Sequence, residues 1–525
     1  MSFVPDTQNK EFQDALNLIQ YTRQSVFLTG KAGTGKSTFL KYICANTKKK
    51  HVVLAPTGIA AINAGGSTLH SFFKLPFYPL LPDDPNFSLQ RGRIHEFFKY
   101  TKPHRKLLEE LELVIIDEIS MVRADIIDAV DRILRVYSRN LREPFGGKQI
   151  LLVGDVFQLE PVVKGDEREI LNRFYPTPYF FSARVFGQID LVSIELQKVY
   201  RQTDSKFIHV LDHIRNNTVG STELQLLNTR YGTQIEQSEA DMYITLATRR
   251  DNVDYINDKK LAELPGDPVT FYGEIMGDFP ESSLPTSQEL VLKPGAQIIF
   301  IKNDFDRRWV NGTIGVISGF DPIEETLYVI TDDGKECDVK RESWRNIRYK
   351  YNEEKKQIEE EELGTFTQYP VRLAWAITVH KSQGLTFSRV VIDFTGGVFA
   401  GGQAYVALSR CTSLEGIQLK KPISRADVFV RPEIVSFSER FNNRTAIDRA
   451  LKQAQADVQY VAAAKAFDKG DFGTFLDEFF KAIHSRYDIE KPNVQRLIRR
   501  KLNIINRLKE ENRALKQAAL EKEKA

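Results

Sequence analysis

The sequence of 525 residues is poor in cysteine and has no long apolar run. Its three cysteines, Cys44, Cys337 and Cys411, are too far apart to indicate a disulfide framework or a zinc site, which is typical of a reducing compartment. No stretch approaches the roughly 18 apolar residues of a membrane span, and no basic region followed by an apolar one opens the chain. We therefore expect a soluble, unexported protein of a prokaryotic cytoplasm or a virus-infected cell.

The sequence also lacks a recognisable metal-binding motif. His209 and His213 have the i, i+4 spacing of a helical metal pair, but the intervening Val-Leu-Asp lacks a metalloprotease glutamate. No third ligand is apparent from the sequence. We interpret the two histidines as part of a packed or exposed helix face.

Net charge is small but unevenly distributed. The formal charge is +3, whereas residues 491–525 hold 11 Lys and Arg against 4 Glu, a net +7, which leaves −4 for the rest. Such a basic segment indicates nucleic acid first among acidic partners, with a solvated helix face as the alternative. The length suggests three or four domains of about 150 residues each.

The segment from Gly30 to Ser37, Gly-Lys-Ala-Gly-Thr-Gly-Lys-Ser, matches the P-loop pattern. It lies between an apolar strand, residues 26–29, and a segment with helical spacing, so backbone N–H groups and a helix N-terminus would form a cradle for phosphates. The lysine would reach the β and γ phosphates, and the serine would hold Mg²⁺. The expected nucleotide-binding residues are Gly30, Gly33, Thr34, Gly35, Lys36, Ser37 and Thr38.

An acidic pair follows a second apolar strand. Val114-Ile115-Ile116 precedes Asp117 and Glu118, which places the aspartate at the strand end to hold Mg²⁺ and the glutamate to orient or deprotonate water. Together with the P-loop, this pair predicts hydrolysis of ATP.

Three further polar residues fit a nucleotide cleft. Gln158 follows the apolar strand 150–153 and would sense the γ-phosphate. Arg201, in Tyr-Arg-Gln, and Arg410, in Ala-Leu-Ser-Arg, suit bidentate phosphate contacts that stabilise transition-state charge. Taken alone, each arginine also fits a surface ion pair.

The order of apolar runs predicts an α/β fold. Strands expected at 52–55, 113–116, 150–153 and 191–194 alternate with helical patterns, which favours a parallel sheet with the P-loop at its carboxyl edge. A second α/β domain is expected from the strands 243–247, 371–377 and 390–394.

Two insertions interrupt this pattern. Prolines at 76, 79, 82 and 85 punctuate residues 74–105, which prevents a central strand or a long helix there. Its aromatic residues Phe77 and Tyr78 would stack on bases or pack under the loop. Short strands and tight turns over about 293–350 predict a small antiparallel barrel, and residues 353–362 an exposed, charged hairpin arm or linker.

Helical patterns dominate after about residue 421. Ile498, Ile505, Leu508 and Leu515 fit a heptad stripe that Lys501 and Asn512 interrupt. A coiled coil is one interpretation, and we favour a single amphipathic helix that docks on the body of the protein. We expect domains at 1–200, 201–420, 421–490 and 491–525.

The ordered motifs resemble those of PIF-type (petite integration frequency) superfamily 1 DNA helicases, relatives of the RecD-type helicases. The resemblance covers about residues 20–420. Beyond the P-loop it rests on Leu-Ala-Pro-Thr-Gly-Ile-Ala-Ala (54–61), Gly-Ser-Thr-Leu-His (66–70), Asp-Glu-Ile-Ser-Met (117–121), Gly-Asp-Val-Phe-Gln (154–158), Thr-Val-His-Lys-Ser-Gln-Gly (378–384) and Tyr-Val-Ala-Leu-Ser-Arg (405–410). The run 118–137 is similar to the family's signature stretch, and its apolar residues fall on one helical face.

This resemblance implies two RecA-like domains with ATP between them, an SH3-like barrel, and movement along single-stranded DNA in the 5′-to-3′ direction. Forked duplex DNA would be unwound in replication, repair or recombination, with residues 74–105 as the wedge. We expect a monomer. Gly384 would lie at the nucleotide, and Gln8, or alternatively Gln13, would contact adenine. The expected DNA-binding residues are Pro56, Thr57, Thr68, His70, Thr378 and His380.

Two alternatives stay open at this point. A P-loop metabolic or signalling NTPase would share the first half of the chain but has no use for the second RecA-like domain. A nucleic-acid-stimulated remodeller would bind and switch without unwinding. Both the helicase and its alternatives need ATP and Mg²⁺.

Overall fold

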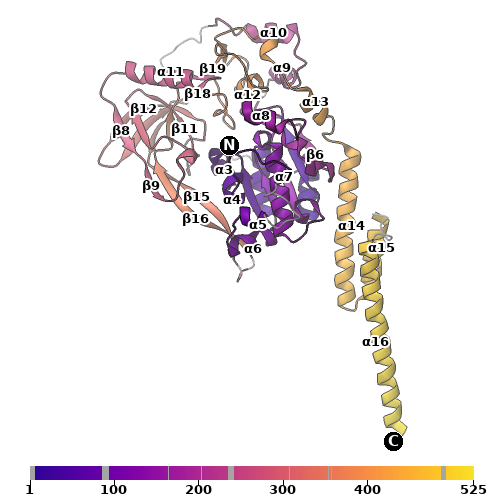
Figure 1. The fold of residues 1–525 in the computed structure, drawn as a ribbon. Coiled ribbons are helices and arrows are strands. Elements are labelled where there is room, and N and C mark those ends of the chain that lie inside the picture. Colours follow the sequence, from indigo (N-terminus) through magenta and orange to yellow (C-terminus); the bar gives the residue numbers. More distant parts are fainter. Residues whose placement is uncertain are drawn as a thin grey trace. The chain divides into compact units, whose positions relative to one another are not determined.

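A computed structural model describes residues 6–84, 94–163, 165–202, 204–233, 242–306, 308–352, 354–355, 357–485 and 492–524. The chain divides into two compact units, Met1–Asn443 and Arg444–Ala525 (Figure 1). Among the described residues, no helix combines the length and the apolar composition that crossing a bilayer requires.

The first unit begins with a six-stranded parallel sheet in the order β3-β2-β4-β5-β1-β6. Its strands are β1 (Val26–Gly30), β2 (His51–Ala55), β3 (Ser67–Thr68), β4 (Leu113–Ile116), β5 (Gln149–Val153) and β6 (Val192–Leu196). Nearly every strand residue is buried, as continuous apolar runs in a sheet covered on both faces require. All carboxyl ends meet at one edge, so the P-loop after β1 lies beside the segments that follow β4 and β5.

Helices flank this sheet as the sequence predicts. They are α1 (Lys10–Tyr21), α2 (Lys36–Asn46), α3 (Gly58–Ala64), α4 (Leu69–Phe73), α5 (Ile94–Phe97), α6 (Lys102–Glu110), α7 (Ala124–Tyr137) and α8 (Gly165–Leu171). The apolar face predicted for α7 is buried: Ile126, Val130, Ile133 and Tyr137 lie in the largest hydrophobic core.

Three buried aspartates on α7 also tie down surrounding loops. Asp125 accepts a hydrogen bond from the backbone N–H of Leu80 (2.9 Å), Asp128 from that of Val185 (3.0 Å), and Asp131 from that of Phe145 (2.5 Å). Each bond satisfies a buried backbone donor that a loop would otherwise leave unpaired. Through Asp125, α7 thus anchors the insertion 74–105 at Leu80.

A second parallel sheet has the order β18-β7-β19-β20. Its strands are β7 (Ile244–Ala247), β18 (Ala376–Thr378), β19 (Val390–Asp393) and β20 (Ile417–Leu419), and its neighbouring helices are α9 (Ser205–Arg215), α10 (Ser221–Asn228), α11 (Arg250–Glu263) and α12 (Gln403–Leu408). The following helix, α13 (Pro432–Ser438), packs instead on the core of the first sheet through Ile434 and Phe437. The α/β architecture with two parallel sheets is thus confirmed.

One predicted strand is wrong. Residues 371–377 were expected to form a single strand, but the chain changes sheets within them. Val371–Leu373 (β17) pairs antiparallel with β11, and Ala376–Thr378 (β18) pairs parallel with β7. The buried Ala374 and the half-buried Trp375 continue the apolar run across the junction, so hydrophobicity alone does not mark the break.

Three antiparallel sheets lie between β7 and β18 in sequence. A five-stranded sheet has the order β14-β13-β12-β11-β17, and the other two are β15-β16-β9 and β10-β8. Their strands are β8 (Val269–Tyr272), β9 (Glu274–Gly277), β10 (Glu289–Leu292), β11 (Gln297–Phe300), β12 (Ile314–Asp321), β13 (Thr326–Thr331), β14 (Glu336–Val339), β15 (Glu342–Asn352) and β16 (Gln357–Gln368). The strands therefore extend on both sides of the range 293–350 in which a barrel was expected.

The long hairpin of β15 and β16 forms an arm (Figure 1). On one side Glu361 pairs with Arg348 (2.7 Å), consistent with the expected charged surface. On the other, Tyr349 is buried and its hydroxyl accepts a hydrogen bond from the N–H of Val53 in β2 (3.2 Å). The arm thus joins the antiparallel region to the first parallel sheet. Of the expected arm 353–362, residues 353 and 356 lie outside the described residues.

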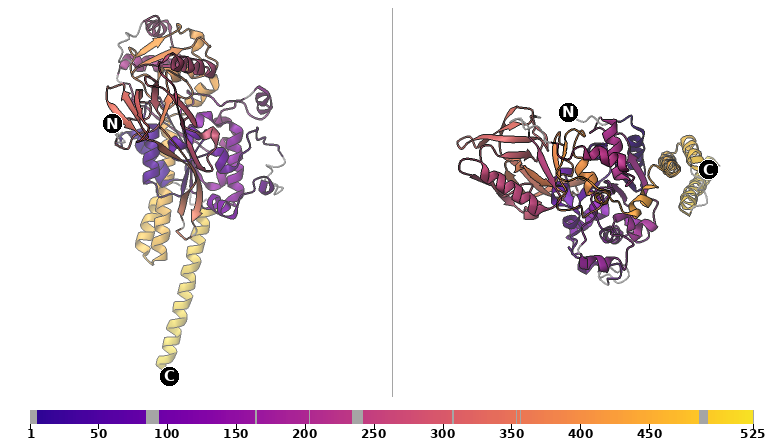
Figure 2. Two further views of the ribbon diagram at one scale, coloured as in Figure 1. Left: turned by 90° about the vertical axis from the view of Figure 1, so that its left-hand side faces the viewer. Right: turned by 90° about the horizontal axis from the view of Figure 1, so that it is seen from above.

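The second unit consists of α14 (Arg444–Asp468), α15 (Phe472–Ser485) and α16 (Pro492–Lys524). The helices α14 and α15 lie side by side, and α16 continues past them (Figures 1 and 2). Ile498 packs against the core formed by Ala456, Tyr460 and Ala482, whereas Leu508 and Leu515 are exposed. Lys501, which interrupts the heptad stripe, is buried and forms an ion pair with Asp468.

Candidate nucleotide site and nucleic-acid face

The P-loop runs from the end of β1 into the first turn of α2. Gly30, Gly33 and Gly35 have φ values of 155°, 81° and 91°, which other residues rarely adopt. A Cβ atom on Gly33 would lie 2.4 Å from the Cβ of Arg201, so the loop closes tightly on the Tyr200-Arg201 segment. Thr34 is buried and its hydroxyl donates to the carbonyl of Lys31 (2.9 Å). Ser37 and Thr38 lie in the first turn of α2, where a bound phosphate would meet the helix N-terminus.

Lys36 lies in the middle of this cradle. Its ammonium donates to the carbonyls of Gly30 (2.6 Å) and Lys31 (3.1 Å). Burial lowers the pKa of Lys36, while the nearby carboxylates of Asp155 and Glu118 oppose that shift. The lysine therefore faces carboxylates from the ends of both β4 and β5.

Asp117 and Glu118 follow β4 at the same sheet edge. Burial raises the pKa of Asp117, and burial together with the charge of Asp117 raises the pKa of Glu118 to about 7. Glu118 has a φ of 49°, a strained left-handed conformation for a residue other than glycine. A partly buried carboxyl group with a pKa near neutrality suits a general base.

Arg201 and Arg410 meet on the opposite wall of the cleft. A guanidinium N–H of Arg201 donates to the carbonyl of Ser409 (3.2 Å), and Arg410 donates to the carbonyl of Ser382 (3.3 Å). Burial and the positive charge of Arg201 lower the pKa of Arg410, and Glu118 acts on it from across the cleft. The structure thus brings together the two arginines and the acidic pair that the sequence predicts.

Gln158 lies next to the segment that carries Arg410. Its side chain is buried and lies 3.5 Å from a carboxylate oxygen of Asp155. A Cβ atom on Gly402, which precedes α12, would lie 2.2 Å from the carbonyl oxygen of Gln158. Only glycine, here with a φ of 81°, allows this approach of the two backbones.

Sequence reasoning missed Arg215, which is fully enclosed. This arginine on α9 pairs with Asp155 after β5 (3.0 Å) and with Glu195 in β6 (2.9 Å), and its guanidinium lies 4.3 Å from the ring centre of Phe157. Although burial opposes it, the charges of Asp155 and Glu195 raise the pKa of Arg215. One helical arginine thus holds two strand ends of the first sheet. The local sequence carried no signal of this role, because a helical arginine has the same local pattern whether it is buried or exposed.

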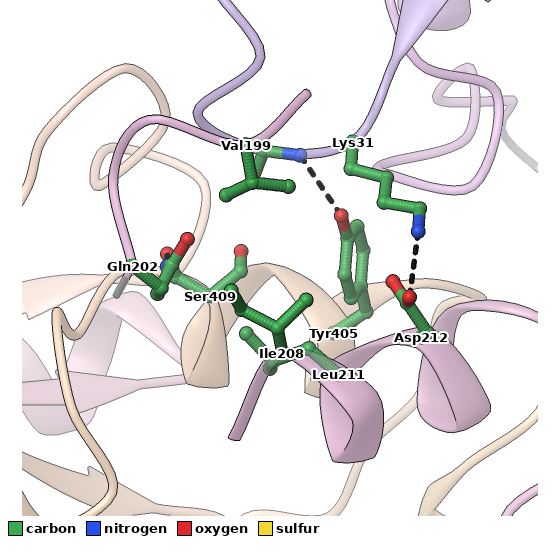
Figure 3. A pocket seen from close by; sticks show the side chains of 9 residues that line it. Lys31, Val199, Gln202, Ile208, Leu211, Asp212, Tyr405 and Ser409 are labelled. Atoms are coloured by element: carbon green, nitrogen blue, oxygen red, sulfur yellow. Dashed lines mark hydrogen bonds and ion pairs between the residues drawn. The ribbon is translucent and has the colours of Figure 1, made fainter. Parts of the chain in front are cut away.

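A small recess beside the P-loop is lined by residues of α9 and α12 (Figure 3). The hydroxyl of Tyr405 accepts a hydrogen bond from the N–H of Ala32 (2.9 Å), and Lys31 forms an ion pair with Asp212 (2.6 Å). Sequence reasoning did not assign a role to either contact. Both connect the P-loop with helices of the second parallel sheet.

The remaining predicted nucleotide residues lie at the margins of the cleft. Gln8 is exposed, two residues after Asp6, which accepts hydrogen bonds from Lys198 and Tyr200. Gln13 instead donates to the carbonyl of Thr7 (2.9 Å). Gly384 is exposed, with a φ of 79°, in the loop whose carbonyls bind Arg410.

The predicted DNA-binding threonines share one local geometry. Thr57, Thr68 and Thr378 each follow or end a parallel strand and accept a backbone N–H from three residues ahead, at 3.1 to 3.2 Å. Pro56 lies between β2 and Thr57. Thr57 and Thr68 cap the helices α3 and α4, and Thr378 caps the turn after β18 in the same way, so the three hydroxyls set the direction of the backbone N–H groups that follow them.

The two predicted histidines are partly buried, and burial lowers the pKa of both His70 and His380. The ring of His70 stacks on that of Phe77 at 4.9 Å, and Phe77 is 84% exposed. One of the insertion's aromatic side chains is therefore free to contact a ligand. Pro85, the last proline of the series, lies outside the described residues.

Cations lie close to Thr378 and His380. Burial and the positive charges of Arg372 and Arg250 lower the pKa of Lys381. Sequence reasoning missed this group because its members come from three separate segments. Clustered positive charge beside backbone N–H groups suits a phosphate chain.

Comparisons with known proteins agree with this geometry. A family model described as PIF1-like helicase matches residues 4–225. The ATP-dependent DNA helicase Pif1 of Bdellovibrio bacteriovorus is 31% identical over 439 residues, which cover 82% of this chain and 91% of that protein. The human ATP-dependent DNA helicase PIF1 is 33% identical over 415 residues, 75% of this chain, but the match spans only 58% of the human protein.

Solved structures of a Bacteroides Pif1 are also similar. Its complex with ADP-AlF4 is 42% identical, covers 82% of this chain and 96% of that chain, and superimposes with a TM-score of 0.75. For a Bacteroides Pif1 bound to single-stranded DNA, also 42% identical, the TM-score is 0.59 with 83% and 97% coverage.

Proposed function

The chain belongs to the PIF1-like helicase family, and we propose on this premise that it is an ATP-dependent DNA helicase. It would translocate 5′-to-3′ along single-stranded DNA and unwind forked duplexes in genome maintenance. The observation that carries the proposal is the convergence of Lys36, Glu118 and Arg410 in one cleft between the two parallel sheets. Because Lys36 and Glu118 come from the first sheet and Arg410 from the second, hydrolysis would depend on the distance between the two sheets.

The residues of the cleft would divide the work on ATP. Lys36 would neutralise the β and γ phosphates, Glu118 would take a proton from the attacking water, and Gln158 would contact the γ-phosphate. Arg201 and Arg410 would stabilise the charge that develops in the transition state. Gln8 would contact adenine, and Gly384 would let the backbone of its loop approach the phosphates.

Mg²⁺ fits the oxygen donors at this site. The hydroxyl of Ser37 and the carboxylate of Asp117 are hard ligands of the kind that this ion prefers. When bound, the ion would neutralise phosphate charge. Asp117 is oriented for that role by the N–H of Glu118, which donates to its carboxylate (2.9 Å).

DNA would cross the sheet edges that carry the threonine caps. Thr57, Thr68 and Thr378, with Pro56, His70 and His380, would bind phosphates and sugars without reading sequence. The related Bacteroides protein binds single-stranded DNA, and another similar structure concerns unwinding of forked double-stranded DNA by two coordinating Pif1 helicases. We keep the prediction that this chain acts as a monomer.

The accessory regions would support strand separation. Residues 74–105 would be the wedge, because Phe77 is exposed and the insertion is anchored on α7. The RecA-like domains would be residues 1–200 and 201–420, and the five-stranded antiparallel sheet, inserted in the second of them, would be an SH3-like barrel that braces the wedge. The helical region 421–490 would precede a basic segment, 491–525, that contacts nucleic acid or a partner.

The test is strand displacement on a fork with a 5′ single-stranded tail, with the same fork bearing a 3′ tail as the polarity control. We expect ATP-dependent displacement on the first substrate and little on the second. Glu118→Gln serves as the matched inactive protein, because it keeps the size of the side chain.

Two results would reject the proposal in different ways. Hydrolysis stimulated by single-stranded DNA without displacement on either fork would indicate a remodeller. Hydrolysis that single-stranded DNA leaves unchanged would indicate a metabolic or signalling NTPase.

A further inference from the structure

The histidines that the sequence left without a third partner acquire one in the fold. His209 and His213 lie one turn apart on α9, with ring centres 4.2 Å apart. Glu223, from the first turn of α10, faces them. Among the described residues these three side chains form the one group of His, Cys, Asp or Glu whose potential ligand atoms all lie within 4.8 Å of one another.

The position of Glu223 is fixed by the backbone. One carboxylate oxygen accepts a hydrogen bond from the N–H of Gly220 (3.0 Å), the residue just before α10. The other oxygen lies 3.6 Å from Nδ1 of His213. The cap therefore occupies one oxygen and turns the second toward the histidines.

We propose that His209, His213 and Glu223 bind a divalent transition-metal ion of the Zn²⁺ class. Two imidazoles and one carboxylate suit such an ion, whereas Mg²⁺ and Ca²⁺ prefer oxygen ligands throughout. In a tetrahedral site with bonds of about 2.0–2.2 Å, donor atoms lie about 3.4 Å apart. The side chains must close by roughly 1.4 Å at most, and the exposure of His209 leaves room for that rotation.

The proposed site is distinct from the ATP cleft but shares a helix with it. Asp212, between the two histidines in sequence, pairs with Lys31 of the P-loop, and Arg215 pairs with Asp155. A bound ion would fasten α9 to α10 on the side of the helix that carries the histidines. It would thereby stiffen the element from which Asp212 and Arg215 reach the first sheet.

The experiment uses the full chain without nucleotide. Zn²⁺ is titrated by calorimetry, Tm is measured with and without ZnCl₂, and Co²⁺ is used as a spectroscopic probe. We expect one saturable site per chain, a higher Tm with Zn²⁺, and a Co²⁺ spectrum without the intense thiolate-to-metal band that cysteine ligands produce. MgCl₂ at the same concentration should not reproduce the shift in Tm.

Variants decide whether these residues are the ligands. His209→Ala and His213→Ala should each weaken Zn²⁺ binding at least tenfold and abolish the shift in Tm. Glu223→Gln should also weaken binding, while its amide oxygen can keep the cap on Gly220. His484→Ala removes an exposed helical histidine from the second unit and should leave binding unchanged.

Three results would overturn the proposal. The first is the absence of saturable Zn²⁺ binding. The second is an affinity for Zn²⁺ in the His209→Ala and His213→Ala variants that equals that of the parent, and the third is a thiolate band in the Co²⁺ complex. None of these readouts depends on ATP hydrolysis or DNA unwinding.

Discussion

The proposed ATP cleft and the predicted DNA-binding face both lie at the carboxyl ends of parallel strands, but they use different strands and different kinds of polar group. In the cleft, Glu118 and Arg410 act on each other's pKa, and the carboxylate of Asp155 acts on both of them and on Arg215. On the DNA-binding face, Thr57, Thr68 and Thr378 are neutral caps of the backbone that follows them. The energy of a buried charge depends strongly on its partners, whereas the hydrogen bond of a cap makes a modest, local contribution to stability. Substitutions in the two regions should therefore differ in size.

The largest effect is expected at Glu118. Glu118→Gln keeps the shape of the side chain but removes the group that accepts the water's proton, so ATP turnover should fall about 10²–10⁴-fold. Steady-state hydrolysis with saturating single-stranded DNA measures the loss. Glu112→Gln, on an exposed glutamate just before β4, is the matched control and should hydrolyse ATP like the unaltered protein. Unchanged turnover in Glu118→Gln would contradict the role of Glu118 as the general base and with it the larger effect expected in the cleft.

Arg410 tests the wall of the cleft contributed by the second sheet. Arg410→Lys keeps a positive charge but loses the planar fork, and we expect turnover to fall about 10³-fold with ATP binding largely retained. Single-turnover hydrolysis and binding of a fluorescent ATP analogue separate the two effects. Arg389→Lys, on the residue just before β19, is the control and should turn over ATP like the parent. An equal loss of binding and turnover would argue that Arg410 holds the ground state instead.

Arg215 tests whether the charges of the cleft are interdependent. Arg215→Leu leaves Asp155 and Glu195 buried without their shared cation, which should lower the free energy of unfolding by about 3–5 kcal/mol. Urea unfolding followed by tryptophan fluorescence measures the change. Arg249→Leu, which breaks an exposed pair with Asp251, should leave the unfolding midpoint near that of the parent. Similar unfolding midpoints for both variants would contradict the expectation that the buried ion pairs of Arg215 stabilise the fold more than the exposed pair of Arg249.

The smallest effects are expected on the DNA-binding face. Removing one cap, as in Thr57→Ala, Thr68→Ala or Thr378→Ala, should weaken binding of single-stranded DNA by about 1 kcal/mol, or roughly fivefold in Kd. Fluorescence anisotropy with a labelled oligonucleotide measures the Kd. Thr47→Ala removes a similar bond, to the N–H of Lys49 (3.3 Å), at the opposite end of α2 and should not change it. A loss of ATP turnover at saturating DNA, as large as that of Arg410→Lys, would show that these caps belong to the cleft.

Much of the fold follows from local sequence. Continuous apolar runs located the strands that precede the P-loop, Asp117 and Gln158, because a strand buried on both faces needs such a run. The same rule failed at 371–377, where one run serves two sheets. Hydrophobicity reports burial, and both sheets bury their strands equally well.

The candidate site was predictable where its residues stand in fixed order after a strand. Lys36, Asp117, Glu118, Gln158 and Arg201 meet because parallel strands of the first sheet deliver their carboxyl ends to one edge, and Arg410 joins them from the end of α12. Arg215 and the cations around Lys381 were missed. Their partners are distant in sequence, and a helical arginine has the same local pattern whether it is buried or exposed.

The sequence by itself determined the α/β architecture, the P-loop and the acidic pair, because each depends on neighbours within a few residues. Only the tertiary structure decided that Arg215 joins two strand ends and that Glu223 faces His209 and His213. Those groups lie on different elements, and their chemistry depends on distance and burial, which the packing of helices against sheets sets. In the sequence the two histidines are only a spaced pair, whereas in the fold Glu223 joins them as a third potential ligand.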